Sequence, residues 1–145
     1  MDKFMKAVAD VLEVDSLELD TRFRETPLWC SLVGFGMLVM MENDWKAPLD
    51  IERFLKLETV RDLYREAFAA LAAKIFGVER SALAGRSCGD LPEWDSVNHL
   101  RLVMEAERRF GITYPLETIP ALKSLDDFIS MRETAPERQD AISKR

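Results

Sequence analysis

The sequence predicts an all-α fold built from two related helical units, one after the other. Three observations predict it: an internal repeat, apolar residues at helical spacing, and helix-capping signals that recur in register with the repeat. Residues of the first half recur 65 positions later, as Trp29 does in Trp94 and Ser31 in Ser96. Further pairs at this offset are Leu32/Val97, Leu38/Val103, Trp45/Phe110, Leu57/Leu122, Thr59/Ser124, Asp62/Asp127 and Leu63/Phe128. Near the N-terminus the offset becomes 64, as between Val11 and Ile75.

The first unit is expected to comprise residues 1–65. Apolar residues at helical spacing predict a helix over about residues 2–12, and a second helix is predicted from Ser31 to about residue 43. In the loop between them, the side chains expected to point into the core are Leu17, Leu19 and Phe23. The run Thr59-Val60-Arg61-Asp62 has the pattern of a capping box, so a further helix is expected to begin there.

The second unit, residues 66–131, is expected to repeat this plan. Its first helix should end at Gly77, and a long loop leads to a helix predicted from Ser96 to Phe110. Gly111 follows as a C-terminal stop signal, because glycine readily adopts the left-handed conformation that ends helices. Ser124-Leu125-Asp126-Asp127 then opens the last helix at the position that matches Thr59.

The two units are predicted to share one continuous helix. No glycine or proline lies between Thr59 and Phe76, and most residues from Arg65 to Lys74 are good helix formers. A single helix of that length would join the units rigidly. Residues 132–145 are highly charged and are expected to form a frayed tail.

Composition narrows the class of protein. The net charge of −6 argues against a nucleic-acid partner, which would need a basic stripe. The longest apolar run, residues 28–41, is interrupted by polar residues and glycines and is shorter than the roughly 20 residues that span a membrane. The N-terminus lacks the pattern of a signal peptide, and the two cysteines have no metal spacing. A cytoplasmic protein with free thiols and without a membrane span is therefore expected.

The segment Leu91–Val97 carries the most specific chemical signal. It places Ser96 at the start of an amphipathic helix, where unpaired backbone N–H groups and the helix dipole would stabilise a phosphate ester. Asp95 can cap the helix, or help to hold a metal ion while a phosphoryl group is delivered. The plainer alternative is that both residues are only helix caps.

The run Leu91–Leu100, followed by residues 105–112 and by Leu125-Asp126-Asp127-Phe128, resembles the acyl carrier protein family. The resemblance covers residues 66–131 and, more weakly, residues 2–65. It implies two four-helix units, with 4′-phosphopantetheine attached to Ser96 by a phosphopantetheinyl transferase that recognises Asp95. It further implies an acyl or aminoacyl cargo held as a thioester, a loading enzyme, and a downstream acyltransferase or synthase of lipid or secondary-metabolite biosynthesis.

The helix after Ser96 departs from this family in two ways. Val97 stands where the family has leucine, and arginines outnumber glutamates along a helix that the best-known members keep strongly acidic. Because complementary charge governs partner choice, a dedicated pathway is expected. His99, one turn after Ser96, either faces the phosphate or occupies an ordinary surface position.

The first unit looks like a degenerate carrier. Ser31 remains as a second candidate attachment site, but Cys30 replaces the aspartate beside it. No charged residue lies between Leu32 and Met41, so both faces of this helix are expected to be buried and the surface that a transferase would meet to be covered. Helix 32–41 is therefore a candidate homodimer or partner surface. The alternative function is an unmodified interaction module that works through this helix.

An enzyme is not expected. Ser96 and His99 lack the third member of a hydrolytic triad and any oxyanion-hole motif. Cys30 lies near a helix N-terminus, where reactive thiols occur, but among Leu28, Trp29 and Leu32 inert packing is the expected role. No metal ligand set is predicted.

Overall fold

A computed structural model describes residues 1–134, and its chain is mostly helical, which confirms the predicted all-α class. The α-helices in chain order are α1 (Lys3–Leu12), α2 (Ser31–Trp45), α3 (Ile51–Lys56), α4 (Val60–Phe76), α5 (Ser96–Phe110) and α6 (Leu125–Ser130). Three short 3₁₀ helices, η1 (Phe23–Glu25), η2 (Arg80–Leu83) and η3 (Leu116–Ala121), lie in the connections. The only strands in the described residues, β1 (Ile112–Thr113) and β2 (Glu133–Thr134), pair antiparallel.

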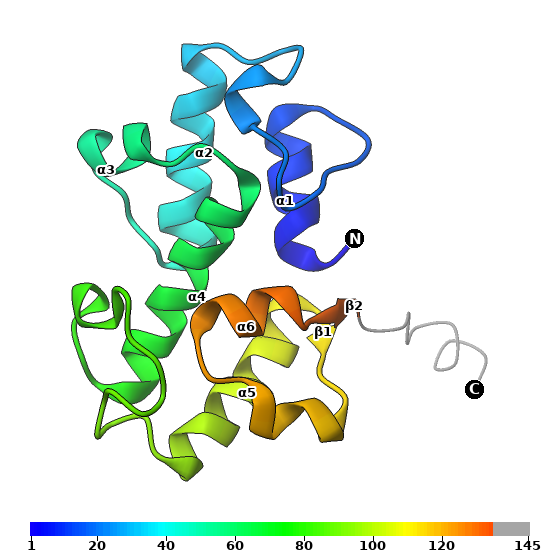
Figure 1. Cartoon of the computed structure of the whole chain (residues 1–145). Helices are drawn as coiled ribbons and strands as arrows, with labels where there is room; N and C mark the ends of the chain where they lie inside the picture. The colour runs from blue at the N-terminus through cyan, green and yellow to red at the C-terminus, as the bar shows by residue number, and fades with distance from the viewer. Residues whose placement is uncertain (135–145) are drawn as a thin grey trace.

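Helix α4 runs through the centre of the molecule. Figure 1 shows it passing from the group formed by α1, α2 and α3 into the group formed by α5 and α6. It is 17 residues long without interruption, begins at a capping box between Thr59 and Asp62, and ends at Gly77, whose φ is +72°. It packs against α1, α2, α5 and α6. The predicted continuous helix is therefore present, and its two ends belong to different groups of helices.

The boundaries of the helices follow their capping residues. Helix α5 begins at Ser96 and ends at Phe110 as predicted, with Asp95 as N-cap and Gly111 in the left-handed conformation as C-cap. Helix α2 also begins at Ser31 as predicted, but it continues to Trp45. Sequence analysis missed α3, although Asp50 caps it by accepting a hydrogen bond from the backbone N–H of Arg53.

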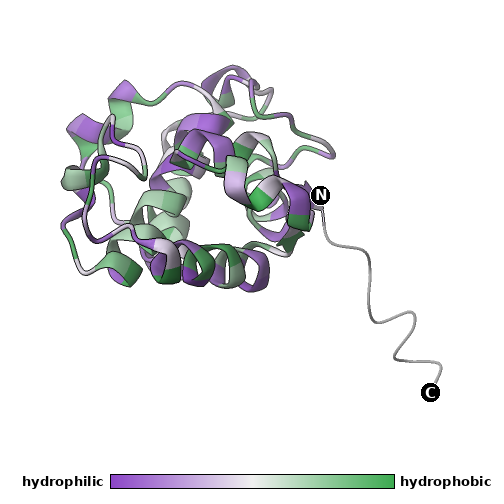
Figure 2. Ribbon diagram, turned by 60° about the horizontal axis from the view of Figure 1, so that its bottom comes forward, coloured by the Kyte–Doolittle hydropathy of each residue, from purple (hydrophilic) through white to green (hydrophobic). Residues whose placement is uncertain are grey.

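One core extends through the whole molecule. Apolar and polar residues alternate along the helices (Figure 2), as expected for amphipathic helices around a common interior. Aromatic rings from several elements meet at its centre: the ring of Phe110 stacks on Phe68 at 4.6 Å between centroids, and Tyr64 lies 5.2 Å from Phe110. Phe23 is fully buried as predicted, whereas Leu17 and Leu19 are partly buried against the core.

Residues related by the 65-residue offset touch each other where α2 and α5 end. The rings of Trp45 and Phe110 stack 5.2 Å apart with an angle of 5° between their planes. The guanidinium of Arg109 donates to the carbonyl oxygen of Asp44 at 2.9 Å. The C-terminal ends of α2 and α5 are therefore in direct contact within the common core.

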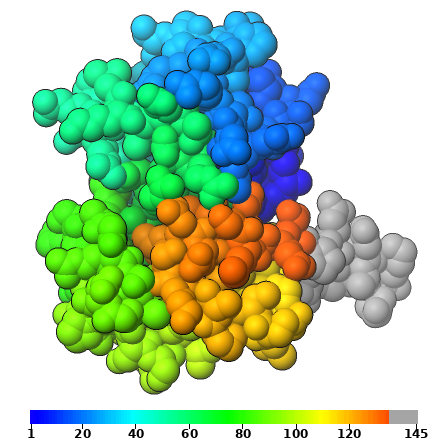
Figure 3. Space-filling model, in the orientation of Figure 1, coloured from blue at the N-terminus to red at the C-terminus, as the bar shows by residue number. Residues whose placement is uncertain are grey.

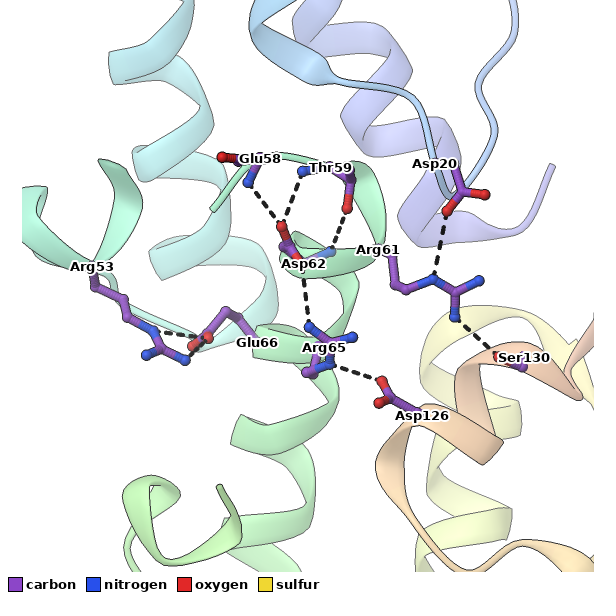
Figure 4. A network of polar contacts seen from close by, with 10 residues as sticks. All are labelled: Asp20, Arg53, Glu58, Thr59, Arg61, Asp62, Arg65, Glu66, Asp126 and Ser130. Carbon is purple, nitrogen blue, oxygen red and sulfur yellow. Dashed lines mark hydrogen bonds and ion pairs between the residues drawn. The ribbon is translucent and has the colours of Figure 1, made fainter. Parts of the chain in front are cut away.

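Polar side chains of α4 connect segments that are distant in sequence (Figure 4). Arg61 donates to Ser130 Oγ at 3.0 Å and lies 3.8 Å from a carboxylate oxygen of Asp20. Arg65 binds Asp62 at 3.1 Å and Asp126 at 2.8 Å. Exposed ion pairs contribute little individually, but these arginines each hold two elements at once and so fix α6 against α4.

The expectation of a frayed tail beginning at residue 132 is wrong for its first residues. Arg132 donates to the carboxylate of Asp2 at 2.8 Å, and its guanidinium lies 4.9 Å from the ring centre of Tyr64. Burial raises the pKa of Tyr64 well above its ordinary value, so its protonated hydroxyl donates to Asp2 as well, at 3.0 Å. These long-range bonds hold the end of the last helix against the start of the first. Residues 135–145 of the expected tail lie outside the described part of the chain.

Candidate functional site at the start of helix α5

Ser96 is the first residue of α5, and it is exposed. It borders a shallow cavity of about 400 Å³ between the start of α5, the end of η3 and the loop before Trp94. Other side chains of this cavity are Cys88, Leu100, Leu122 and Lys123. Within residues 1–134 the Ser96 hydroxyl has no hydrogen-bond partner, so it is presented to solvent at the mouth of the cavity.

Asp95 caps the helix. Its carboxylate oxygen accepts the backbone N–H of Asn98 at 2.9 Å, and the Asn98 amide in turn donates to the carbonyl of Glu93 at 2.8 Å. The first N–H groups of α5, those of Ser96 and Val97, have no acceptor within the helix, and the positive end of the helix dipole lies there. A negatively charged group on the Ser96 oxygen would be stabilised by this environment.

His99 lines the same cavity as Ser96, and both of its ring nitrogens have partners within the protein. Its Nδ1 accepts a hydrogen bond from the indole N–H of Trp94 at 3.1 Å, and its Nε2 lies 3.0 Å from the carbonyl oxygen of Ile119. The imidazole that satisfies both partners carries its proton on Nε2. His99 therefore ties α5 to the preceding loop and to η3. Sequence analysis missed this role because Ile119 becomes a neighbour of His99 only in the fold.

The loop before Ser96 is anchored at several points. The ring of Trp94 is buried and lies 5.1 Å from the ring of Phe76 at the end of α4. The backbone N–H of Cys88 donates to the carbonyl of Lys123 at 2.8 Å. Hydrogen bonds from the backbone N–H and hydroxyl of Ser87 lower the pKa of Asp90. Ser96 is consequently held by a fixed frame, and Lys123, which the sequence did not single out, is placed beside it.

An apolar stripe continues from Ser96 along the exposed face of α5. Val97, Leu100 and Met104 are 57%, 52% and 66% exposed, respectively. Their spacing places them on one side of the helix. Three large apolar side chains in a row on an exposed helix are typical of a surface that binds another protein.

The start of α2 has the same layout with different chemistry. Ser31 is the first residue of this helix and is exposed, but the N-cap residue Cys30 makes no side-chain capping bond. Cys30 is also exposed, so the expectation that it packs inertly is wrong, and its thiol and that of Cys88 are free. Trp29 packs against Gly34, where an added Cβ would lie only 3.2 Å from the indole ring.

The prediction that both faces of α2 are buried is wrong for the single chain. Leu32, Phe35 and Val39 are 77%, 63% and 39% exposed, whereas Met37 and Met41 are fully buried. The helix is apolar all round because it has a core face and a second, exposed apolar face. This exposed face occupies the positions that match Val97, Leu100 and Met104 at the 65-residue offset.

The two serines are not brought together. Helices α2 and α5 meet at their C-terminal ends, so Ser31 and Ser96 begin helices that start at opposite ends of the molecule (Figure 1). The space-filling view shows the same separation, with the segment around residue 30 at one end of the surface and residues 80–100 at the other (Figure 3). Any chemistry at Ser96 is therefore local to the second half of the chain.

Comparisons with protein-family models, curated proteins and solved structures find no match to this chain. Across residues 1–134, no helix combines the length and the apolar character needed to cross a membrane. Within the same residues, no three histidine, cysteine or carboxylate side chains are grouped to hold a metal ion. The interpretation of the site therefore depends on its own geometry and sequence.

Proposed function

We propose that this protein is an acyl or aminoacyl carrier of the acyl carrier protein type, with 4′-phosphopantetheine attached to the Ser96 hydroxyl. The observation that carries the proposal is the exposed, unpartnered hydroxyl of Ser96 at the Asp95-capped start of α5. The resemblance of Leu91–Leu100 to the carrier family is the reason to interpret this hydroxyl as an attachment site. The protein would act in the cytoplasm as a substrate-bearing partner and not as an enzyme.

The residues around Ser96 fit the phosphate end of such an arm. The unpaired N–H groups at the start of α5 and the amine of Lys123, which lines the same cavity, can stabilise its negative charge. Leu100 and Leu122 provide an apolar wall beside it. When attached, the arm supplies a terminal thiol that holds the cargo as a thioester. The stripe of Val97, Leu100 and Met104 would receive the transferase, the loading enzyme and the acyltransferase or synthase of a lipid or secondary-metabolite pathway.

The chain is further proposed to be a tandem of two four-helix carrier-like units, residues 1–65 and 66–131, that share α4. The capping boxes at Thr59 and Ser124 lie at equivalent positions and open equivalent segments. The stacking of Trp45 on Phe110 also agrees with two copies of one plan. The first unit would be a pseudo-carrier that supports the second, because Cys30 provides no carboxylate beside Ser31.

Intact-mass measurement tests the carrier function directly. The unmodified chain is incubated with coenzyme A and a broad-specificity phosphopantetheinyl transferase, and a gain of one 4′-phosphopantetheine group is expected. Ser96→Ala should abolish the gain, and Ser31→Ala is the matched control that should retain it. A wild-type chain whose mass does not change would refute the carrier function, and a second gain lost in Ser31→Ala would show that the first unit is also active.

A second candidate function follows from the exposed apolar face of α2. Leu32, Phe35 and Val39 form an uncharged surface that fits a protein partner or a second copy of this chain. If self-association through this face is the working state, sedimentation should show dimers that Phe35→Glu converts to monomers. Leu55→Glu, at an equally exposed leucine of α3, is the control and should leave the dimer intact.

A further inference from the structure

A groove with a strongly cationic lining lies beside the apolar stripe of α5. It has a volume of about 590 Å³ and is formed by the C-terminal end of α2, the second half of α4 and the outer face of α5. Its charged side chains are Lys46, Lys74, Arg101, Arg108 and Arg109 on the cationic side and Glu105 alone on the anionic side. We call it the basic groove. Helices α4 and α5 and the C-cap residue of α2, Lys46, contribute cations to it, so the complete groove needs both halves of the molecule.

The charge of the groove is opposite to that of the whole chain. The protein carries a net charge of −6, yet five cations and one carboxylate meet here. Glu105 is occupied by Arg108 at 2.6 Å, and Arg109 is held by the carbonyl of Asp44. Lys74 and Arg101 make no ion pair with any of residues 1–134. These two cations are therefore free to meet an external anion, and their field attracts acidic groups.

The equivalent surface of the first half lacks these cations. At the 65-residue offset, the positions of Arg101 and Arg108 are held by Gly36 and Asn43, and at the 64-residue offset the position of Lys74 is held by Asp10. Apart from Lys46, the cations of the basic groove therefore belong to the half that contains Ser96. A protein that acts on Ser96 would therefore meet these cations on the same half of the chain.

The form of the groove favours a protein over a small ligand or a membrane. Small-molecule sites bury most of the ligand and use a few precisely placed buried polar groups, whereas Lys46, Lys74 and Arg101 are all exposed. A membrane surface meets convex amphipathic faces, but these cations line a hollow between three helices. Long, exposed cations above an apolar floor suit the acidic flanks and apolar face of a helix.

The groove is continuous with the surface around Ser96. Met104 belongs both to the apolar stripe and to the wall of the groove, and it is 66% exposed. From Ser96 to Arg108 the helix rises about 18 Å, which one protein domain readily covers. A protein that reaches Ser96 along the stripe would therefore also contact the groove.

We infer that the basic groove docks an acidic, amphipathic helix of the enzyme that loads or unloads the group carried on Ser96. The apolar face of that helix packs on Met104 and Leu71, and its carboxylates pair with Lys74 and Arg101. This inference rests on the proposed carrier function. It places the acidic side chains on the partner, because α5 itself carries more arginines than glutamates.

The test uses the full chain and two synthetic helical peptides that share one leucine-rich face and carry either glutamate or lysine on its flanks. Titration calorimetry and the NMR signal of the Met104 methyl group report binding. The glutamate peptide should bind and shift Met104, more weakly as salt is raised, and K74E/R101E should reduce its affinity about tenfold or more. The matched control K6E/K56E, at exposed lysines outside the groove, makes the same change in net charge and should bind like wild type.

Because Lys74 lies in the last turn of α4, the variant K74Q/R101Q is measured as well, and a smaller loss of affinity is expected from it. Equal binding of both peptides, or equal losses in the groove and control variants, would overturn the inference. Vesicles containing one third phosphatidylglycerol that bind through Lys74 and Arg101 while the peptide does not would also overturn it. If the chain binds the glutamate peptide but the transferase leaves it unmodified, the carrier function is refuted and the docking role of the groove stands. If the chain is modified but binds both peptides equally, the docking role is refuted and the carrier function stands.

Discussion

The starts of α2 and α5 share one backbone plan but hold their tryptophans by different physical means. In both, a tryptophan precedes the N-cap residue, a serine is the first helical residue and an apolar stripe follows on the exposed face. Trp94 is held by a hydrogen bond to His99, which in turn reaches the carbonyl of Ile119. Trp29 is held by aromatic packing instead, with its ring 5.6 Å from Phe23 and 6.4 Å from Phe54.

Equivalent positions account for this difference. Gly34 stands where the second half has His99, and Phe54 stands where it has Ile119. The removal of the imidazole lets the indole of Trp29 lie directly on the helix backbone. The comparison shows that the same kind of helix start can be held by polar contacts in one half and by apolar packing in the other. The N-cap residues also differ, because Asp95 provides a carboxylate that caps α5 and Cys30 makes no side-chain capping bond to α2.

The largest expected effect is at His99. His99→Ala leaves the indole N–H of the buried Trp94 without its acceptor, so the free energy of unfolding should fall by about 2 kcal/mol. Urea unfolding measures this change. In Trp94→Phe, which removes the donor, the further cost of His99→Ala should be smaller. Equal costs in both backgrounds would show that the hydrogen bond does not anchor this end.

Two glycines of α2 test how Trp29 packs at the start of that helix. Gly34→Ala places a Cβ about 3.2 Å from the rigid indole of Trp29, so a loss of about 1–2 kcal/mol is expected despite the better helix propensity of alanine. At Gly36 the nearest atom to an added Cβ is 3.9 Å away. Gly36→Ala should therefore stabilise α2 by up to about 1 kcal/mol. The opposite signs are checked by thermal unfolding of the two variants.

The capping box at the start of α4 makes stability depend on pH through Asp62. Burial raises the pKa of Asp62, but the backbone N–H groups of Glu58 and Thr59 and the charge of Arg65 outweigh it and lower the pKa below its ordinary 3.8. The stability that Asp62 contributes is therefore complete above pH 3.8 and is lost as the pH falls through the lower, folded-state pKa.

Asp62→Asn should cost about 1 kcal/mol near neutral pH and remove part of the loss of stability in acid. Unfolding in urea at about pH 6 and about pH 3 measures both effects. An unchanged acid dependence in the variant would contradict the assignment. Asp127 occupies the equivalent capping box at the start of α6, but Ser130 stands where the first half has Arg65. Asp127→Asn is therefore measured in parallel as a comparison for Asp62→Asn.

The smallest expected effect is a gain at the start of α2. Cys30 has the extended backbone of an N-cap residue, with φ −159° and ψ 176°, but no side-chain capping bond. Cys30→Asp should supply one and raise the free energy of unfolding by up to about 1 kcal/mol. If the missing carboxylate is also what disables Ser31, intact mass will show a second modification in this variant, and a single modification would place the defect elsewhere on α2.

Local signals predicted the helices well. Asp95 and Gly111 mark both ends of α5, and the unbroken run from Thr59 to Phe76 predicted α4. Helix α3 was missed although Asp50 offered a cap, because Arg53 stands where the equally short α6 has the capping-box carboxylate Asp127. Capping and periodicity are properties of neighbouring residues, so they can be read from a sequence without knowing the fold.

The features that the sequence could not supply depend on distant residues. The anchoring role of His99 was missed because its partner Ile119 lies on another element. Arg132 was assigned to a tail although it binds Asp2. The uncharged stretch of α2 predicted burial on both sides, but the chain has no further element to cover Phe35 within residues 1–134. The basic groove could not be predicted either, since its cations come from α4, α5 and the residue that follows α2.

The continuity of α4 has a consequence for how the protein can be divided. A cut between residues 65 and 66 would fall in the middle of this helix, next to the buried side chains of Glu66 and Phe68. Neither fragment would retain the whole of α4, which closes the interior of both halves. We therefore expect the two halves to melt together in a single calorimetric peak, and truncated genes encoding one half to yield aggregated protein.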